Sequence, residues 1–293
     1  MKGVVKMCRN IKRWMSVILI FAFTLVGAVP AQAVVAEQEE DTCAINEYQA
    51  LQNMHDELES TSTSKFQSEY NLSDEELAVI ENYQQYYSEK IVQLKQYTDE
   101  QWRNVDYTED QVAAIREFDP NHVDEDILMR AATSVDVSGD FQNYEHGENG
   151  TTVEYIVEFH WNGIASNWFN DIFAITWNSP LNETDSDGYV NYKSVSGFVS
   201  EVKHNPRPEG LYATAIEFPK YLHDNEHGEA SYVNAGSIIG TLHANTNVRD
   251  ITGYCAYGHT MLDINPGFTV GSAGVSISFD TGIKKVGEDR FYR

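Results

Sequence analysis

The sequence predicts an α+β protein with segregated elements: a small N-terminal helical region followed by an all-β sandwich or jelly-roll-like domain. The first observation behind this is a change of hydrophobic period near residue 135, from helical spacing over 44–118 to two-residue alternation from 151 onward. The second is a helix-start pattern that occurs three times between residues 71 and 119. The third is a series of apolar stretches after residue 150, separated by turn-rich segments.

The chain divides into four predicted segments: a signal peptide (1–33), an acidic helical region (34–119), a linker (120–140) and the β-sandwich domain (141–293). The signal peptide is predicted from a basic start, an apolar run over 14–29 and the small-residue pattern Ala31-Gln32-Ala33. We expect cleavage after Ala33 and a secreted, extracellular protein; an uncleaved anchor is the alternative. No second apolar run of spanning length follows, so we expect no stable membrane span in the mature chain.

Charge narrows the classes of partner. The formal net charge of the whole chain is −25, and loss of the signal peptide, which carries five basic and no acidic residues, would bring it to −30. Nucleic acid is therefore an unfavourable partner, because the phosphate backbone attracts clustered Lys and Arg. An anionic membrane is unfavourable for the same reason. We expect no cofactor. The sequence also lacks the alternation of strands and long helices that a Rossmann or TIM architecture needs.

The three helix-start patterns each combine a capping box, an acidic first turn and a hydrophobic staple. The capping pairs are Ser73 with Glu76, Thr98 with Gln101, and Thr108 with Gln111. The staple pairs are Leu72 with Leu77, Tyr97 with Trp102, and Tyr107 with Val112. The stretch "DYTEDQVAAIRE" lacks the glycine of a calcium loop, so its acids are interpreted as helix-start residues. The first helix is predicted to continue to about Gln96, and a further helix is predicted upstream over 44–60.

Residues 120–140 show no sustained period, which indicates a linker. A prosegment removed at Arg130-Ala131 is the alternative.

In the β-domain, Val153, Tyr155, Val157, Phe159 and Trp161 share one predicted face of a strand. The stretch 171–178 is apolar on both faces, which is typical of a central strand.

Two cysteines, Cys43 and Cys255, remain after removal of the signal peptide. An even pair in an oxidising compartment predicts a disulfide. The alternatives are two unpaired thiols or Cys255 as a nucleophile with His259 as its base. On a strand, positions four apart lie on one face but about 13 Å from each other, so this catalytic pair would need a turn, which Gly258 could provide.

His223, Glu226 and His227 have the spacing of an inverted zinc-protease motif. That chemistry needs both histidines on one helix, whereas Pro219 and Gly228 indicate a turn. A solvated loop is the favoured interpretation, and a structural or adventitious metal site is the alternative.

Aromatic residues supply the candidate binding site. Trp168 and Phe169 lie in the polar stretch "GIASNWFND" and are predicted surface anchors for a sugar ring or a protein partner; a packing lid is the alternative. Trp161 and Trp177 are predicted to face the core. The stretch 268–282 alternates small or polar residues with apolar ones, as a membrane hairpin would, although an edge strand has the same pattern.

The phrases "LSDEELAVIENY" and "YTEDQVAAIREFD" resemble segments of secreted proteins of Gram-positive bacteria that also carry a C-terminal β-domain. The stretch Tyr257–Thr260, "YGHT", lies where a late strand of that domain is expected. The resemblance implies export and a two-part layout; it implies no activity and assigns no functional residue.

Taken together, these patterns predict a secreted β-sandwich that binds a carbohydrate or a protein surface. The first alternative is an extracellular hydrolase that uses the His/Glu or Cys/His residues above. The second is a secreted toxin or bacteriocin-like protein.

Overall fold

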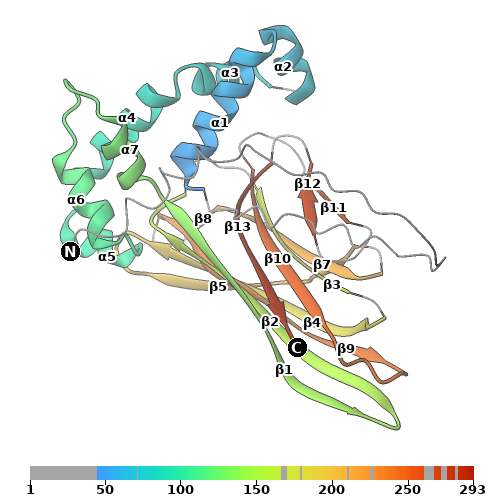
Figure 1. Cartoon of the computed structure of the whole chain (residues 1–293). Coiled ribbons are helices and arrows are strands. Elements are labelled where there is room, and N and C mark those ends of the chain that lie inside the picture. Colours follow the sequence, from blue (N-terminus) through green and yellow to red (C-terminus); the bar gives the residue numbers. More distant parts are fainter. Residues whose placement is uncertain are drawn as a thin grey trace, which may run out of the picture. The chain divides into compact units, whose positions relative to one another are not determined.

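The computed structural model describes residues 45–293, apart from 71, 166–169, 179, 210, 225–227, 261–266, 272–275 and 281–282. The described residues belong to one compact unit. Helices occupy 47–131 and antiparallel strands occupy 134–292, which confirms the predicted α+β class with a β-sandwich (Figure 1). None of the helices described is long and apolar enough to cross a membrane.

The helical region contains α1 (Glu47–Ser60), α2 (Thr63–Tyr70), α3 (Asp74–Glu81), α4 (Tyr83–Leu94), α5 (Asp99–Asn104), α6 (Glu109–Glu117) and α7 (Glu125–Ala131). All three predicted capping boxes are present, at the starts of α3, α5 and α6. A fourth, between Asn46 and Gln49, starts α1 and was not recognised from the sequence. Its signal is weaker because Asn replaces the usual Ser or Thr.

Two expectations about this region were wrong. The helix predicted to run from residue 74 to about 96 is interrupted at Asn82, whose side-chain amide donates to the Ala78 carbonyl at 2.9 Å. Asn favours such local side-chain bonds over helix continuation. The stretch 120–140 is not a linker, because it holds α7 and the first part of β1 (Ser134–Gly147). Leu128 and Ala131 of α7 are buried in the helical core, so Arg130-Ala131, the cleavage point of the prosegment alternative, lies inside a packed helix.

The sandwich is built from two large sheets. One has the order β1-β2-β9-β4-β5, with β8 also paired to β9; the other has the order β13-β10-β3-β7-β6. Besides β1, the strands are β2 (Gly150–Asn162), β3 (Asn170–Trp177), β4 (Asn182–Ser194), β5 (Val199–His204), β6 (Arg207–Pro208), β7 (Ala213–Pro219), β8 (Tyr221–Asp224), β9 (Glu229–Ala244), β10 (Thr252–Thr260), β11 (Phe268–Val270), β12 (Ile277–Phe279) and β13 (Ile283–Tyr292). The two sheets pack through their inner faces.

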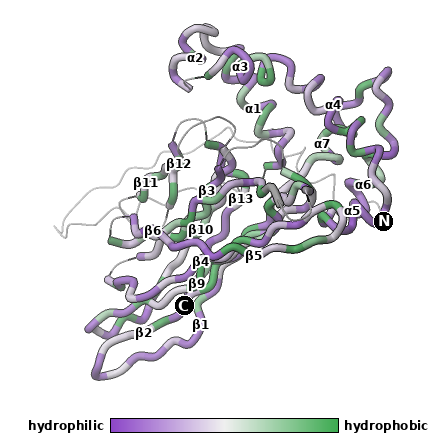
Figure 2. The backbone as a smooth tube through the Cα atoms, turned by 180° about the vertical axis from the view of Figure 1, so that it is seen from behind, coloured by the Kyte–Doolittle hydropathy of each residue, from purple (hydrophilic) through white to green (hydrophobic). Residues whose placement is uncertain are grey.

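The predicted strand faces are confirmed. Every second residue of β2, from Val153 to Trp161, is buried in the core between the sheets, whereas Glu154 and Glu158 are exposed. Trp161 and Trp177 are fully buried core residues. Hydrophobic segments run along β10 and β3, and the far end of the β1–β2 hairpin is hydrophilic (Figure 2).

Strand β3 lies in the middle of its sheet, as its sequence predicts. Its second face is buried because a small hairpin, β11 with β12, lies against it. Ile172 of β3 and Ile277 of β12 belong to the same buried cluster. Within the described residues, the stretch considered as a membrane hairpin therefore supplies a packing layer, with Ile277 only 3% exposed.

Candidate functional site

Five charged or titratable side chains meet where the helical region packs on the sandwich, and they form what we call the charge cluster: Glu47, Lys90, Asp171, Lys220 and His259. They come from α1, α4, the start of β3, the residue after β7 and the end of β10. Glu47, Asp171 and His259 have no exposed side-chain area, and Lys220 has 1%. Buried charges are costly unless they are paired, so the partners of each group define what the cluster can do.

Glu47 connects the helices to the sandwich. Its Oε2 atom accepts hydrogen bonds from Lys90 Nζ at 2.8 Å, Thr133 Oγ1 at 3.0 Å and Tyr87 OH at 3.3 Å. Its position is fixed by the α1 start, where its own amide also donates to the Thr133 carbonyl at 3.0 Å. Burial alone would raise the pKa of Glu47, but the ammonium of Lys90 and the nearby His259 hold that pKa well below its usual value. Glu47 is therefore an anion.

His259 lies between two carboxylates. Its Nδ1 atom is 3.1 Å from Asp171 Oδ2, and its Nε2 atom is 3.3 Å from Glu47 Oε1. The Nε2 approach misses hydrogen-bond geometry, so Nε2 lacks a hydrogen-bonded partner among the residues described. The ring also packs against Trp161, with centroids 5.2 Å apart.

Asp171 and Lys220 form the innermost pair. Asp171 accepts hydrogen bonds from Tyr257 OH at 2.7 Å and from the Thr260 amide at 2.8 Å. Lys220 Nζ lies 3.6 Å from Asp171 Oδ1 and donates to the Thr260 carbonyl at 2.9 Å. Burial opposes ionisation of both, yet Lys220 and His259 lower the pKa of Asp171. Burial also lowers the pKa of Lys220, which favours its neutral amine.

A solvent-open hollow adjoins the cluster, and we call it the tyrosine pocket. Its lining residues are Tyr86, Glu89, Lys90, Gln93, Leu94, Tyr97, Ile164, Ala165, Tyr221 and Tyr232. Its volume is about 260 Å³. Tyr221 and Tyr232 are cross-strand partners in β8 and β9, with ring centroids 6.0 Å apart. Lys90 belongs to both features, because its ammonium binds Glu47 and the Ile164 carbonyl.

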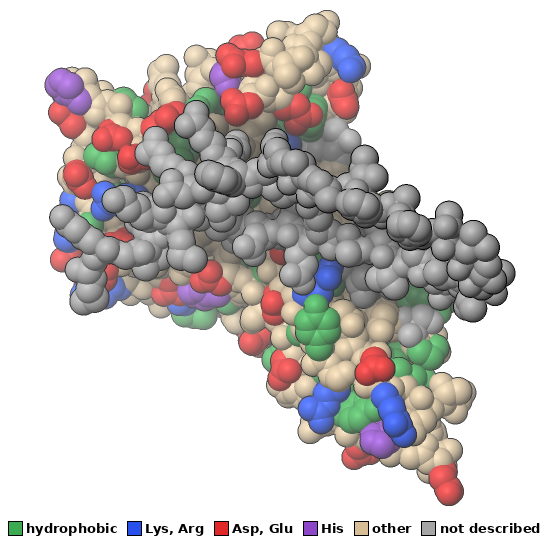
Figure 3. Space-filling model, in the orientation of Figure 1, with side chains coloured by type: hydrophobic (Ala, Val, Ile, Leu, Met, Phe, Trp, Pro, Cys, Tyr) green, Lys and Arg blue, Asp and Glu red, His purple; other side chains and the backbone are tan. Residues whose placement is uncertain are grey.

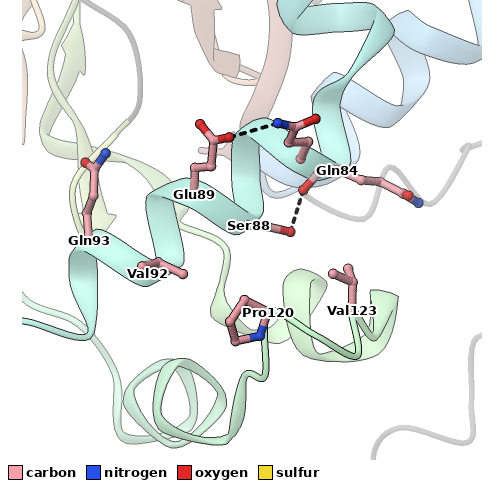
Figure 4. A pocket seen from close by; sticks show the side chains of 8 residues that line it. Gln84, Ser88, Glu89, Val92, Gln93, Pro120 and Val123 are labelled. Atoms are coloured by element: carbon pink, nitrogen blue, oxygen red, sulfur yellow. Dashed lines mark hydrogen bonds between the residues drawn. The ribbon is translucent and has the colours of Figure 1, made fainter.

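A second hollow lies on the helical region between α4 and residues 120–123 (Figure 4). Its volume is about 630 Å³, and its apolar residues are Val92, Pro120 and Val123. Figure 4 shows Val92 of α4 pointing toward Pro120. On the face drawn in Figure 3, acidic side chains are spread over the helical region, in keeping with the net charge of −25.

The structure separates the predicted catalytic pair. Cys255 and His259 lie on β10 in regular strand register except for a bulge after Tyr257, so no turn at Gly258 brings them together. Four residues of strand separate their Cα atoms by about 13 Å. Cys255 is fully buried, which raises the pKa of its sulfhydryl group, and its sulfur is 3.8 Å from the Asp289 carbonyl oxygen. Its predicted partner Cys43 lies outside the described residues, so the disulfide stays a prediction.

The other predicted sites are only partly visible. Trp168, Phe169, Glu226 and His227 lie outside the described residues. The backbone at position 223 is in strand β8 rather than on a helix, which the zinc-protease motif would need. One group among the described residues has metal-ligand spacing: His55, Asp56 and Glu59 of α1, with ligand atoms within 4.8 Å of one another. It is a mostly exposed surface group.

Sequence reasoning identified His259 but not its partners. Glu47, Lys90 and Lys220 occupy ordinary polar positions in separate segments, and only the fold brings them together. Asp171 gave the one available signal, because it begins a strand that is otherwise apolar on both faces. Likewise, the tyrosines of the pocket come from parts of the chain with no shared motif.

No family model and no curated protein matches this chain. Among solved structures, it is similar to the C-terminal domain of the Streptococcus agalactiae AgI/II polypeptide BspA, with 10% identity and a TM-score of 0.29 over 54% of this chain and 49% of that one. It is also similar to AvmM, which catalyzes macrocyclization in alchivemycin A biosynthesis, with 13% identity and a TM-score of 0.23 over 52% of this chain and 89% of that one. A third similar structure is a pore forming protein, with 9% identity and a TM-score of 0.25 over 55% of this chain and 90% of that one. This chain thus spans about half the length of the BspA structure. Likenesses at these TM-scores are too weak to support a function.

Proposed function

We propose that the protein is a secreted binding module whose tyrosine pocket holds a carbohydrate. The observation that carries this proposal is the convergence of four tyrosines, from α4, the α4–α5 turn, β8 and β9, on one hollow that is open to solvent. Aromatic rings provide flat apolar faces with polar tips, which suit the C–H faces and hydroxyl groups of a sugar.

The remaining lining supports the same ligand class. Glu89 and Gln93 provide a carboxylate and an amide on one face of α4, next to the apolar contact surface of Leu94 and Ile164. The lining therefore offers polar and apolar surface in similar measure, as a sugar with its C–H faces and hydroxyl groups requires. The volume of about 260 Å³ is just below the usual range of small-molecule sites, ~300–1,000 Å³. We therefore expect a short ligand, such as the end of a glycan chain. Residues 164–165 lead directly into the stretch that carries Trp168 and Phe169, which we propose as further anchors.

The pocket is tested by a glycan and cell-surface binding screen with the wild type and Tyr221→Ala. We expect Tyr221→Ala to lose most of its glycan binding, because the half-buried Tyr221 ring forms part of the pocket wall. Tyr292→Ala is the matched control: Tyr292 is 63% exposed at the end of β13 and does not line the pocket. Equal urea midpoints for the three proteins would show that the fold is intact. Unchanged binding by Tyr221→Ala, or a wild type that retains no glycan, would contradict the proposal.

Neither alternative function gains support from the described residues. The Cys255–His259 pair of the hydrolase hypothesis is separated and buried, so it offers no substrate access. The strands considered for a membrane hairpin, β11 and β12, have three residues each in the described part, which is far shorter than a spanning strand.

A further inference from the structure

We propose that Lys220 and Asp171 condense into an intramolecular isopeptide bond that covalently joins the end of β7 to the start of β3. This site lies in the charge cluster and is independent of the tyrosine pocket and its ligand. The two residues are near neighbours on adjacent strands, since Asp171 is the register partner of Phe218. The cross-link would therefore lock the centre of one sheet of the sandwich.

Proximity is the first requirement, and the fold provides it. Lys220 Nζ lies 3.6 Å from Asp171 Oδ1, which places the amine beside the carboxyl group that it would attack. The side chains are 1% and 0% exposed, so bulk water has no access to the pair. The amine is further fixed by its hydrogen bond to the Thr260 carbonyl. Such positioning replaces an improbable encounter with an intramolecular step.

The groups around Asp171 match what amide formation needs. The Thr260 amide donates to Oδ1 at 2.8 Å, where it can stabilise negative charge on the oxygen that stays. Tyr257 OH and His259 Nδ1 both contact Oδ2, at 2.7 and 3.1 Å. They can therefore supply protons to the oxygen that leaves. Burial disfavours the ammonium form of Lys220, which favours the amine that acts as nucleophile.

The reaction balances without a co-reactant. The Lys220 ammonium gives up two protons, and its nitrogen forms a bond to Cγ of Asp171. The Cγ–Oδ2 bond breaks, and Oδ2, which Tyr257 OH and His259 Nδ1 contact, takes up those two protons and leaves as one water molecule. Nothing is oxidised or reduced, and the charge of the pair is zero before and after. The product removes one positive and one negative charge from the interior, which ends the desolvation cost of the ion pair.

Intact mass spectrometry of the whole purified chain, under denaturing and reducing conditions, tests the proposal directly. We expect a mass about 18 Da below the value calculated from its own termini, the loss of one water. Reduction removes any contribution from a Cys43–Cys255 bridge. After digestion, the peptide with Asp171 should remain attached to the peptide with Lys220. A wild type with its full calculated mass after storage at neutral pH would overturn the proposal, because an ion pair does not survive denaturation.

Two variants assign the bond. Lys220→Arg keeps the positive charge but should restore the full mass. Lys193→Arg is the matched control, because Lys193 Nζ lies only 2.6 Å from Asp106 Oδ2 but both side chains are 26% exposed. It should keep the 18 Da deficit. If instead Lys193→Arg restores the full mass, the bond lies elsewhere and the assignment to Lys220 is wrong. Should Lys220→Arg fail to fold, the wild-type mass and the linked peptide still decide the question.

Discussion

The carboxylate of Glu47 in α1 lies 3.3 Å from the imidazole of His259 in β10, and neither side chain reaches solvent. The two residues come from the first helix and a late strand, so the contact joins the helical region to the sandwich. The same carboxylate also accepts from Lys90 and Thr133. Glu47 is therefore the point at which helices and strands share one network of charges, and we expect the two regions to unfold together.

Glu47→Gln should strongly destabilise the protein. The substitution removes the buried anion that binds Lys90, and removal of one partner of a buried ion pair costs about 3–5 kcal/mol. Urea unfolding followed by circular dichroism measures the free energy of unfolding. Glu81→Gln, an exposed position at the end of α3, should change that free energy by no more than about 0.5 kcal/mol. Equal effects of the two substitutions would show that the charge cluster does not support the fold.

The free energy of unfolding should fall in acid because of Glu47. The pKa of Glu47 in the folded protein is well below the ordinary value of 4.5. Its stabilising contribution is therefore fully present above that ordinary value and is lost as the pH falls through the folded pKa. We expect a stable range from neutral pH down to about pH 5 and a decline below it. The pKa of Asp171 is lowered as well, so this carboxyl group contributes in the same direction unless it has formed the proposed amide with Lys220.

Urea midpoints measured from pH 7 to pH 3 test this dependence. In Glu47→Gln the slope on the acid side should be shallower than in the wild type, because one depressed carboxyl group is missing. The same slope in both proteins would assign acid unfolding to other carboxyl groups.

The helix starts were predictable because their signals are local. Thr108 and Gln111 are three residues apart, and their reciprocal bonds depend on nothing else in the fold. The α7 helix escaped prediction because its seven residues are too few to show a period. The partners of His259 could not be inferred for another reason: they lie on other elements, and no spacing in the sequence relates them.

The tyrosine pocket shows the same limit. The sequence predicts an aromatic binding site around Trp168, where several aromatic residues lie close together in the chain. Two of that cluster, Trp161 and Trp177, are core residues, as the strand alternation indicated. The tyrosines that line the pocket are instead spread from Tyr86 to Tyr232. Sequence alternation thus predicts burial well, but not which exposed side chains converge.

Thr108→Ala should lower the free energy of unfolding by about 1 kcal/mol, the usual cost of a lost helix cap. The Thr108 hydroxyl accepts a hydrogen bond from the backbone amide of Gln111 at 3.2 Å. The side-chain amide of Gln111 in turn donates to the Ala132 and Asn162 carbonyls. Thr108→Ser keeps the hydroxyl and should remain within about 0.5 kcal/mol of the wild type. Urea midpoints again provide the measurement. A Ser variant as weak as the Ala variant would mean that the methyl group, rather than the cap, matters.

Gly236→Ala should destabilise the sandwich by roughly 1–3 kcal/mol, because the added methyl group overpacks the core. Gly236 in β9 faces its register partner Phe159 in β2, and a Cβ atom there would lie 2.5 Å from the Phe159 ring and 2.7 Å from the Tyr189 carbonyl oxygen. The ring is held by contacts with Phe173, Phe218 and Tyr257, so it cannot move aside freely.

Gly147→Ala is the matched control for this substitution. It lies at the end of β1, where an added Cβ would meet nothing within 4 Å, so the free energy of unfolding should change by less than about 0.5 kcal/mol. Thermal and urea unfolding of the two variants compare the same chemical change in a packed and an open position. If Gly236→Ala were as stable as Gly147→Ala, the Phe159 cluster would have to be able to rearrange, and the close pairing of β2 with β9 would not need a glycine.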